Sequence, residues 1–100
     1  MALAATFRLL GDPTRLRILL HCGNGRVAVG GLAAELKLDP SLVSQHLRLL
    51  RAGRIVSGRR SGKHVFYQLN DKHVERALGV MIEHADEIAA GRSARLKQAP

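Results

Sequence analysis

Two histidines and two carboxylates near the end of the chain have the types and spacing to bind a metal ion. His73 and His84 are eleven positions apart, and Glu87 follows His84 by three. On a helix that turns by roughly 100° per residue, the histidines differ by roughly 20° around the axis, and Glu87 lies about 60° from His84. Asp71, at the start of the segment, is either a fourth ligand or a helix cap. The predicted metal ligands are therefore Asp71, His73, His84 and Glu87.

One helix cannot bring these four side chains to a single ion. Eleven helical residues span roughly 16 Å, far more than two metal–ligand distances. Two copies of the helix packed antiparallel about a two-fold axis would place the start of one beside the end of the other. We therefore expect a homodimer with two sites, each combining Asp71 and His73 of one copy with His84 and Glu87 of the other.

The ligand types indicate which metals to expect. A tetrahedral set of nitrogen and oxygen ligands suits Zn(II) or Co(II), and Ni(II) usually takes more than four ligands. The chain contains one cysteine, Cys22, so it offers no pair of thiolates for a soft ion. Zn(II) is the expected effector, with Co(II) or Ni(II) as alternatives. Cys22, His21 and His64 are the remaining candidates for a second site.

A basic segment precedes the metal ligands. Residues 40–70 contain no Asp or Glu but six Arg or Lys residues, whereas residues 71–87 contain five acidic residues. The net charge of the chain is +8. The basic segment favours a polyanion as its partner, and the acidic segment favours a cation.

The hydrophobic periodicity and the turn signals predict the elements that position these residues. Asp12 is placed to cap a helix that starts at Pro13, and Asp39 or Ser41 to cap a later one. Gly91 is expected to end the last helix. The expected elements are helices over residues 2–10, 13–22, 31–38, 42–52 and 71–90, an extended stretch at 26–29, and a hairpin that pairs 55–56 with 65–69 around a basic tip at 58–63.

Two short helices followed directly by a hairpin are typical of a winged helix-turn-helix, in which the second helix enters the major groove of DNA. The expected fold class is α+β, mainly α, with five helices and a β-hairpin wing. Gln45 has an amide that can bond an adenine edge in two places. The predicted DNA contacts are the polar residues of the second helix and the basic residues of the wing: Ser41, Ser44, Gln45, His46, Arg48, Arg59, Arg60 and Lys63.

The chain is expected to form one domain over residues 1–91, with a basic tail over residues 92–100. The apolar start is too short and too interrupted for a secretory signal, and no apolar run is long enough to cross a bilayer. A cytoplasmic protein is therefore expected. An enzyme is not, because the serines, Cys22 and five histidines form no recognisable group of nucleophile, base and orienting residue.

Three segments resemble the ArsR/SmtB family of bacterial metal-responsive repressors. Residues 10–19, LGDPTRLRIL, are similar to the opening signature of the family. Residues 41–47, SLVSQHL, are similar to its recognition helix, and residues 60–67 to its wing. The spacing of Asp71, His73, His84 and Glu87 is similar to the zinc site on the last helix of the zinc sensors of this family, which lies across the dimer interface.

The resemblance implies that the apo dimer represses its operator and that metal binding lowers its affinity for DNA. The chain departs from the thiol-sensing branches of the family, because Val29, Gly30 and Gly31 stand near the place where those members carry a Cys-x-Cys pair. The alternative hypothesis is a winged-helix transcriptional regulator that senses no metal.

Overall fold

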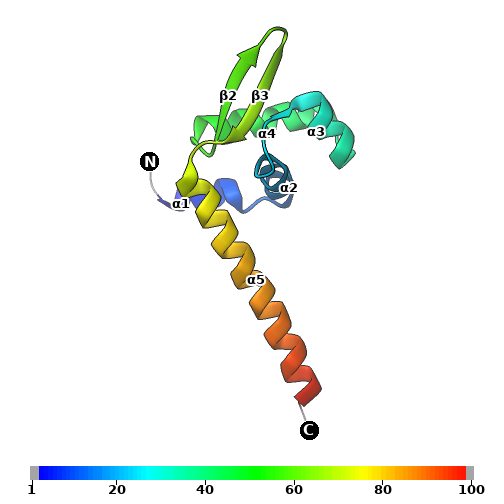
Figure 1. Cartoon of the computed structure of the whole chain (residues 1–100), viewed down its shortest axis with the longest axis vertical. Helices are drawn as coiled ribbons and strands as arrows, with labels where there is room; N and C mark the ends of the chain where they lie inside the picture. The colour runs from blue at the N-terminus through cyan, green and yellow to red at the C-terminus, as the bar shows by residue number, and fades with distance from the viewer. Residues whose placement is uncertain (1–2, 99–100) are drawn as a thin grey trace.

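In residues 3–98, which the computed structural model describes with side chains through Gly91, five helices and three strands follow one another (Figure 1). This confirms the expected winged helix-turn-helix. The elements are α1 (Leu3–Leu10), α2 (Pro13–Cys22), β1 (Val27–Ala28), α3 (Val29–Leu36), α4 (Pro40–Ala52), β2 (Val56–Ser61), β3 (His64–Leu69) and α5 (Lys72–Gln98).

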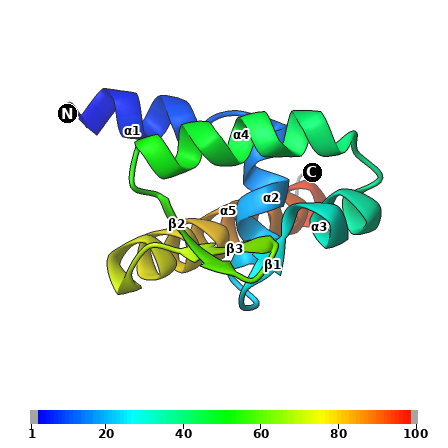
Figure 2. The same cartoon turned by 90° about the horizontal axis from the view of Figure 1, so that it is seen from above.

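The core lies where α2, α3 and α4 meet the inner face of the sheet, as the view from above shows (Figure 2). Helix α4 buries Val43, Leu47 and Leu50, which recur every three or four residues and so form one stripe. Ile18 and Leu19 of α2 are fully buried against this stripe. The polar side of α4 is therefore turned away from the core.

The sheet has three antiparallel strands in the order β1-β3-β2, because β1 pairs with β3 through Val27↔Tyr67 and Ala28↔Phe66. The sequence predicted an extended stretch here, but not that it joins the hairpin. The predicted long tip at residues 58–63 is wrong, since β2 continues to Ser61 and pairs there with His64. A two-residue loop remains, and its first residue, Gly62, has a φ of +63°, as tight hairpin loops require.

The helix-turn-helix boundaries also differ from the prediction by two residues. Helix α3 begins at Val29 and ends at Leu36, because Lys37 adopts the left-handed conformation. Helix α4 begins at Pro40, because Asp39 rather than Ser41 is its cap. Proline suits the first helical position, since it has no N–H that would need a partner.

The last helix is longer than predicted and leaves the body of the protein (Figure 1). The prediction that Gly91 ends it is wrong: α5 continues to Gln98. A helical glycine costs only about 1 kcal/mol and does not by itself stop a helix. The division of the chain into a domain over 1–91 and a tail from residue 92 remains a prediction. Among the described residues, no helix is both long and apolar enough to span a membrane.

Candidate nucleic-acid interface and metal centre

The turn between α3 and α4 is closed by backbone and capping hydrogen bonds. Lys37, with φ 57° and ψ 47°, turns the chain out of α3, and the N–H of Leu38 donates to the carbonyl of Ala33 at 2.9 Å. Two residues later, a carboxylate oxygen of Asp39 accepts from the N–H of Ser41 at 2.7 Å. These bonds hold the start of α4 in place relative to the core.

Four of the five residues predicted to read DNA from α4 lie on one surface. Ser41, Gln45 and Arg48 are exposed, Ser44 is half-buried, and with Pro40 they line a shallow groove of about 340 Å³. The surface offers two hydroxyls, an amide and a guanidinium. Hydroxyl, amide and guanidinium groups are those that bond base edges and phosphates in a major groove.

The fifth residue, His46, is placed differently. It is half-buried, and its Nδ1 lies 3.4 Å from Nη1 of Arg15 in α2. It does not line the groove formed by Ser41, Ser44, Gln45 and Arg48. This contact was not foreseen, because Arg15 is 31 residues away in sequence.

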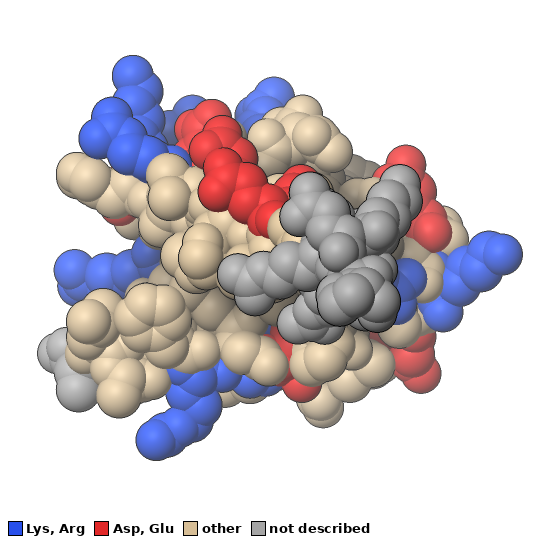
Figure 3. Space-filling model, turned by 90° about the horizontal axis from the view of Figure 1, so that it is seen from below, with Lys and Arg blue, Asp and Glu red and all other residues tan. Residues whose placement is uncertain are grey.

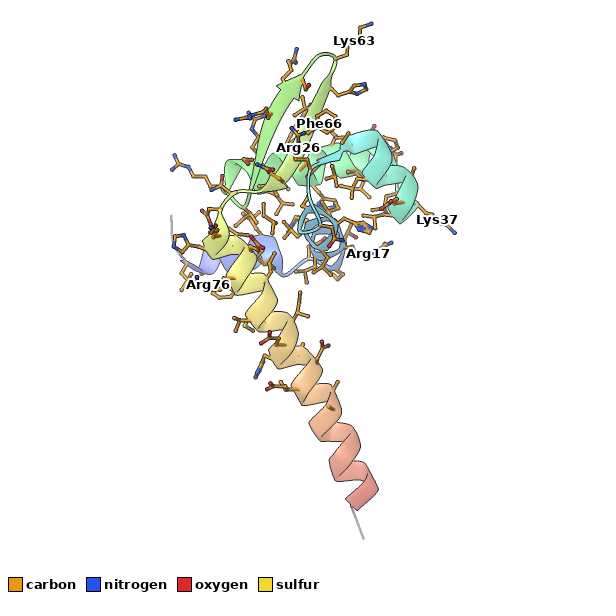
Figure 4. The ribbon with its side chains drawn as sticks, in the orientation of Figure 1. Arg17, Arg26, Lys37, Lys63, Phe66 and Arg76 are labelled. Atoms are coloured by element: carbon orange, nitrogen blue, oxygen red, sulfur yellow. The ribbon has the colours of Figure 1, made fainter. Side chains whose placement is uncertain are left out.

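The strand alternation separates the basic residues of the wing. Arg59 is paired with Phe66 and Arg60 with Val65, so the two arginines project from opposite faces of the sheet. Lys63 lies in the loop, and Figure 4 shows it at the wing tip. All three side chains are exposed. They therefore present positive charge on both faces and at the end of the wing.

The first two predicted metal ligands lie together at the start of α5. Oδ1 of Asp71 is 3.7 Å from Nδ1 of His73, and the His73 side chain is 94% exposed. The same carboxylate accepts from the N–H of Val74 at 3.0 Å and from the side chain of Asn70 at 3.1 Å. The hydrogen bond from Val74, followed by that from Asn70, lowers the pKa of Asp71. Asp71 thus caps α5 as an anion, and its oxygens keep lone pairs for a cation.

The other two predicted ligands, His84 and Glu87, are exposed on the far half of α5. Within the described residues, no three His, Cys, Asp or Glu side chains come close enough together to hold a metal ion. The view along α5 from below shows acidic side chains on several sides of this helix (Figure 3). A single chain therefore offers two separate pairs of ligands rather than a complete site.

The remaining candidates for a second metal site do not gather. Nε2 of His21 lies 3.4 Å from a carboxylate oxygen of Glu35 in α3, and His64 lies on the wing beside Phe66. Cys22 is buried, which raises its pKa to about 11. A thiol held in its protonated form is a poor metal ligand.

An apolar groove of about 570 Å³ lies between α1 and the first half of α5, and the sequence analysis did not predict it. Phe7 of α1 and Met81 of α5, both more than half exposed, are on its walls. Further along α5, Ile82 and Ile88 are also exposed. The sequence did contain a signal for this groove. The apolar residues of α5 form a wider stripe than the body of one chain buries, so that Val74 and Leu78 pack on the core while Met81, Ile82 and Ile88 are exposed.

Comparison with known proteins identifies the helix-turn-helix. The family of bacterial regulatory proteins described as the arsR family matches residues 12–57, from the cap of α2 to the start of β2. The "Transcriptional repressor SmtB homolog" of Synechocystis is 39% identical over 85% of this chain, which spans 64% of its length. The "HTH-type transcriptional regulator NmtR" of Mycobacterium tuberculosis is 38% identical over 92% of this chain and 77% of its own.

Solved structures agree with this result over most of the fold. The homodimeric winged helix-turn-helix DNA-binding domain Mb0332 of Mycobacterium bovis superposes with a TM-score of 0.81 at 28% identity, covering 84% of this chain and 78% of that one. The solution structure of apo-NmtR gives 0.75 at 38% identity, covering 84% and 71%. The sequence relatives are named as regulators or repressors of transcription rather than as enzymes.

Proposed function

The chain belongs to the arsR family of bacterial regulatory proteins, and we propose that it is a repressor that a divalent metal ion releases from operator DNA. The observation that carries the proposal is the pair of ligand sets on α5. Asp71 with His73 lies at the start of this helix and His84 with Glu87 further along, in a stretch, residues 79–91, where every residue is exposed. Such a repressor acts on bacterial DNA in the cytoplasm.

The DNA-binding part of the proposal rests on α4 and the wing. Helix α4 presents Ser41, Gln45 and Arg48 on its exposed side, where they would meet base edges in the major groove. The wing presents Arg59, Arg60 and Lys63 to the phosphates beside that groove. His46, held by Arg15, would contribute through Nε2 only.

The dimer is inferred from surface that one chain leaves uncovered. Leu3, Phe7, Val80 and Met81 are all more than half exposed, and they line the groove between α1 and α5. Contiguous apolar surface of this kind on a small domain marks an interface. A second copy packed about a two-fold axis would cover the groove and the outer half of α5 together.

In that dimer, Asp71 and His73 of one copy would face His84 and Glu87 of the other. The separation of 3.7 Å between Asp71 Oδ1 and His73 Nδ1 is close to that of two ligands of one tetrahedral zinc ion, each about 2 Å from the metal. Because the His73 side chain is exposed, it can rotate to bring its nitrogen to the slightly shorter separation that two ligands of one zinc ion have. Two imidazoles and two carboxylates suit Zn(II) first, with Co(II) or Ni(II) as alternatives.

A bound ion would supply a cross-link between the two copies of α5. Val74 and Leu78 of α5 pack against the core that also contains Leu47 and Leu50 of α4. A change in the angle between the two copies of α5 is therefore transmitted to the spacing of the two copies of α4, which the operator requires to be fixed. A coupling of about 1–3 kcal/mol is typical of such regulation.

The proposal is tested by titrating a protein–DNA complex with metal. A duplex site selected from a random library is the probe, and Zn(II), Co(II) and Ni(II) are added in turn at fixed salt, because phosphate contacts make binding salt-dependent. We expect the parent to be released by zinc and His84→Ala to stay bound. If zinc released the parent and His84→Ala from DNA at the same concentration, the assignment of His84 as a metal ligand would be wrong. If calorimetry found no tight zinc binding to the apo protein, the alternative hypothesis, a winged-helix regulator that senses no metal, would replace the proposal.

A further inference from the structure

The outer face of the wing carries a basic pocket in which Arg59, a predicted DNA contact, is joined by Arg26, which the predicted DNA contacts do not include. The inner face, with Val56 and Tyr67, packs on the core. The alternation of the strands turns Ser57 and Arg59 of β2, and Phe66 and Gln68 of β3, to the other face. Arg26, the residue before β1, reaches this face from the neighbouring strand.

Arg26 is positioned by an aromatic ring. Its guanidinium carbon lies 5.6 Å from the centre of the Phe66 ring, and Figure 4 shows the two side chains next to each other on the sheet. A guanidinium that stacks on an aromatic face keeps its N–H groups free in its own plane. Phe66 therefore holds the charge of Arg26 in one place without using its hydrogen-bond donors.

Arg26 shares a pocket with a second arginine. A depression of about 240 Å³ is lined by Arg26, Arg59 and Phe66, together with Ser57, Gly58 and Gln68. The lining thus provides two guanidiniums, a hydroxyl and an amide, all of which can donate hydrogen bonds. This is the donor set that proteins use to bind a phosphate group.

Among the side chains that the structure describes, no carboxylate pairs with the two arginines of this pocket. Residues 23–34 and 40–70 contain no Asp or Glu. In the part of the chain with described side chains, neither Arg26 nor Arg59 takes part in a side-chain hydrogen bond or an ion pair. Two uncompensated cations therefore face one small pocket.

We propose that Arg26 and Arg59 form a phosphate-binding site on the outer face of the wing, and that it takes a backbone phosphate of duplex DNA. The inference rests on the proposed DNA-binding function and extends it, because it adds Arg26, which belongs to neither α4 nor the hairpin, to the phosphate contact assigned to Arg59. The site lies on the same wing as Lys63, so DNA that reaches the tip would run close to it. The contact would carry no sequence information, because every nucleotide presents the same phosphate.

The test uses the full chain without metal and a labelled duplex of arbitrary sequence, about 30 base pairs long, whose binding is measured by fluorescence anisotropy over a range of KCl concentrations. Each phosphate contact adds about 0.9 to the slope of log K against log salt. We expect Arg26→Ala to weaken binding several-fold at low salt and to reduce this slope by about 1 for each bound subunit. Arg26→Lys keeps the charge without the planar fork, so it should retain the slope but bind less tightly.

Lys72→Ala is the matched control, because Lys72 is exposed at the start of α5, the helix that extends away from the wing. It should bind DNA as the parent does. An unchanged slope in Arg26→Ala, with normal binding by the parent, would overturn this inference alone, whereas a parent that binds no duplex would overturn the proposed function. Binding of inorganic phosphate that depends on Arg26, combined with an unchanged slope on DNA, would show a site for free phosphate and overturn the DNA assignment.

Discussion

Nη1 of Arg15 lies 3.4 Å from Nδ1 of His46, and the same guanidinium donates to the carbonyl oxygens of Leu9, at 2.8 Å, and Arg8, at 3.4 Å. One side chain of α2 thus joins the end of α1 to α4. Since a guanidinium can only donate, His46 Nδ1 must accept, and the ring proton is on Nε2. His46 is therefore part of the framework of the DNA-binding surface.

Arg15→Ala should lower the free energy of unfolding by about 2 kcal/mol, because it removes hydrogen bonds from a charged donor that links three helices. Urea denaturation at one fixed protein concentration measures the change. Arg48→Ala is the comparison, since Arg48 is exposed on α4, the helix that also carries His46. It should change stability by less than about 0.5 kcal/mol but weaken DNA binding. Equal stability of the two variants would contradict the role given to Arg15.

Two substitutions at Asp71 separate its capping role from its proposed metal ligation. Asparagine caps helices as well as aspartate does, and alanine does not. Asp71→Asn should therefore keep the stability of α5 but weaken zinc binding, whereas Asp71→Ala should reduce both. Stability is measured by thermal unfolding monitored with circular dichroism, and zinc binding is measured by calorimetry. If Asp71→Asn bound zinc as tightly as the parent does, Asp71 would be a helix cap and not a metal ligand.

The response to metal should weaken in acid. An imidazole must be deprotonated to bind a metal ion, and imidazole side chains ordinarily titrate near pH 6.5. The zinc concentration that half-releases the protein from DNA should therefore rise as the pH falls through about 6.5. The titration is repeated between about pH 5.5 and pH 8. A flat dependence would argue against ligation by His73 and His84.

The buried thiol of Cys22 should make stability depend on alkaline pH. Burial raises its pKa from the ordinary 9.0 to about 11, so the folded state holds this proton more tightly than the unfolded state. The resulting stabilisation is complete below pH 9 and is lost as the pH rises towards 11. We expect the parent to lose up to about 2 kcal/mol more than Cys22→Ala across this range. Parallel pH curves for the two proteins would contradict this, as would rapid alkylation of the folded parent at neutral pH.

The turn of the helix-turn-helix contains a strained residue. Lys37 has a φ of +57°, and a residue with a Cβ pays roughly 1–2 kcal/mol in this region. Lys37→Gly should therefore raise the free energy of unfolding by about 1 kcal/mol. Lys37→Ala keeps the Cβ and should have little effect. If both variants had the same denaturation midpoint, the strain at this position would be refuted.

Local sequence patterns determined the order of helices and strands. Prolines and carboxylates at residues 12–13 and 39–40 mark the starts of α2 and α4, since capping and proline geometry involve only neighbouring residues. The polar side of α4 followed from its apolar period. The same patterns did not predict the pairing of β1 with β3 or the continuation of α5 through Gly91, because strand pairing is long-range and a single glycine weakens a helix without ending it.

The four predicted metal ligands, Asp71, His73, His84 and Glu87, show what the sequence determines by itself. Their types and their spacing along a helix, and hence the roughly 16 Å between the two histidines, follow from the chain alone, because a regular helix has a fixed rise. The capping of the helix by Asp71 and its distance of 3.7 Å from His73 are likewise local, because these contacts join residues at most three positions apart. Only the tertiary structure decided that His46 packs on Arg15 and that Arg26 shares a pocket with Arg59. Those contacts join segments far apart in sequence, and only the packing of the core brings such segments together.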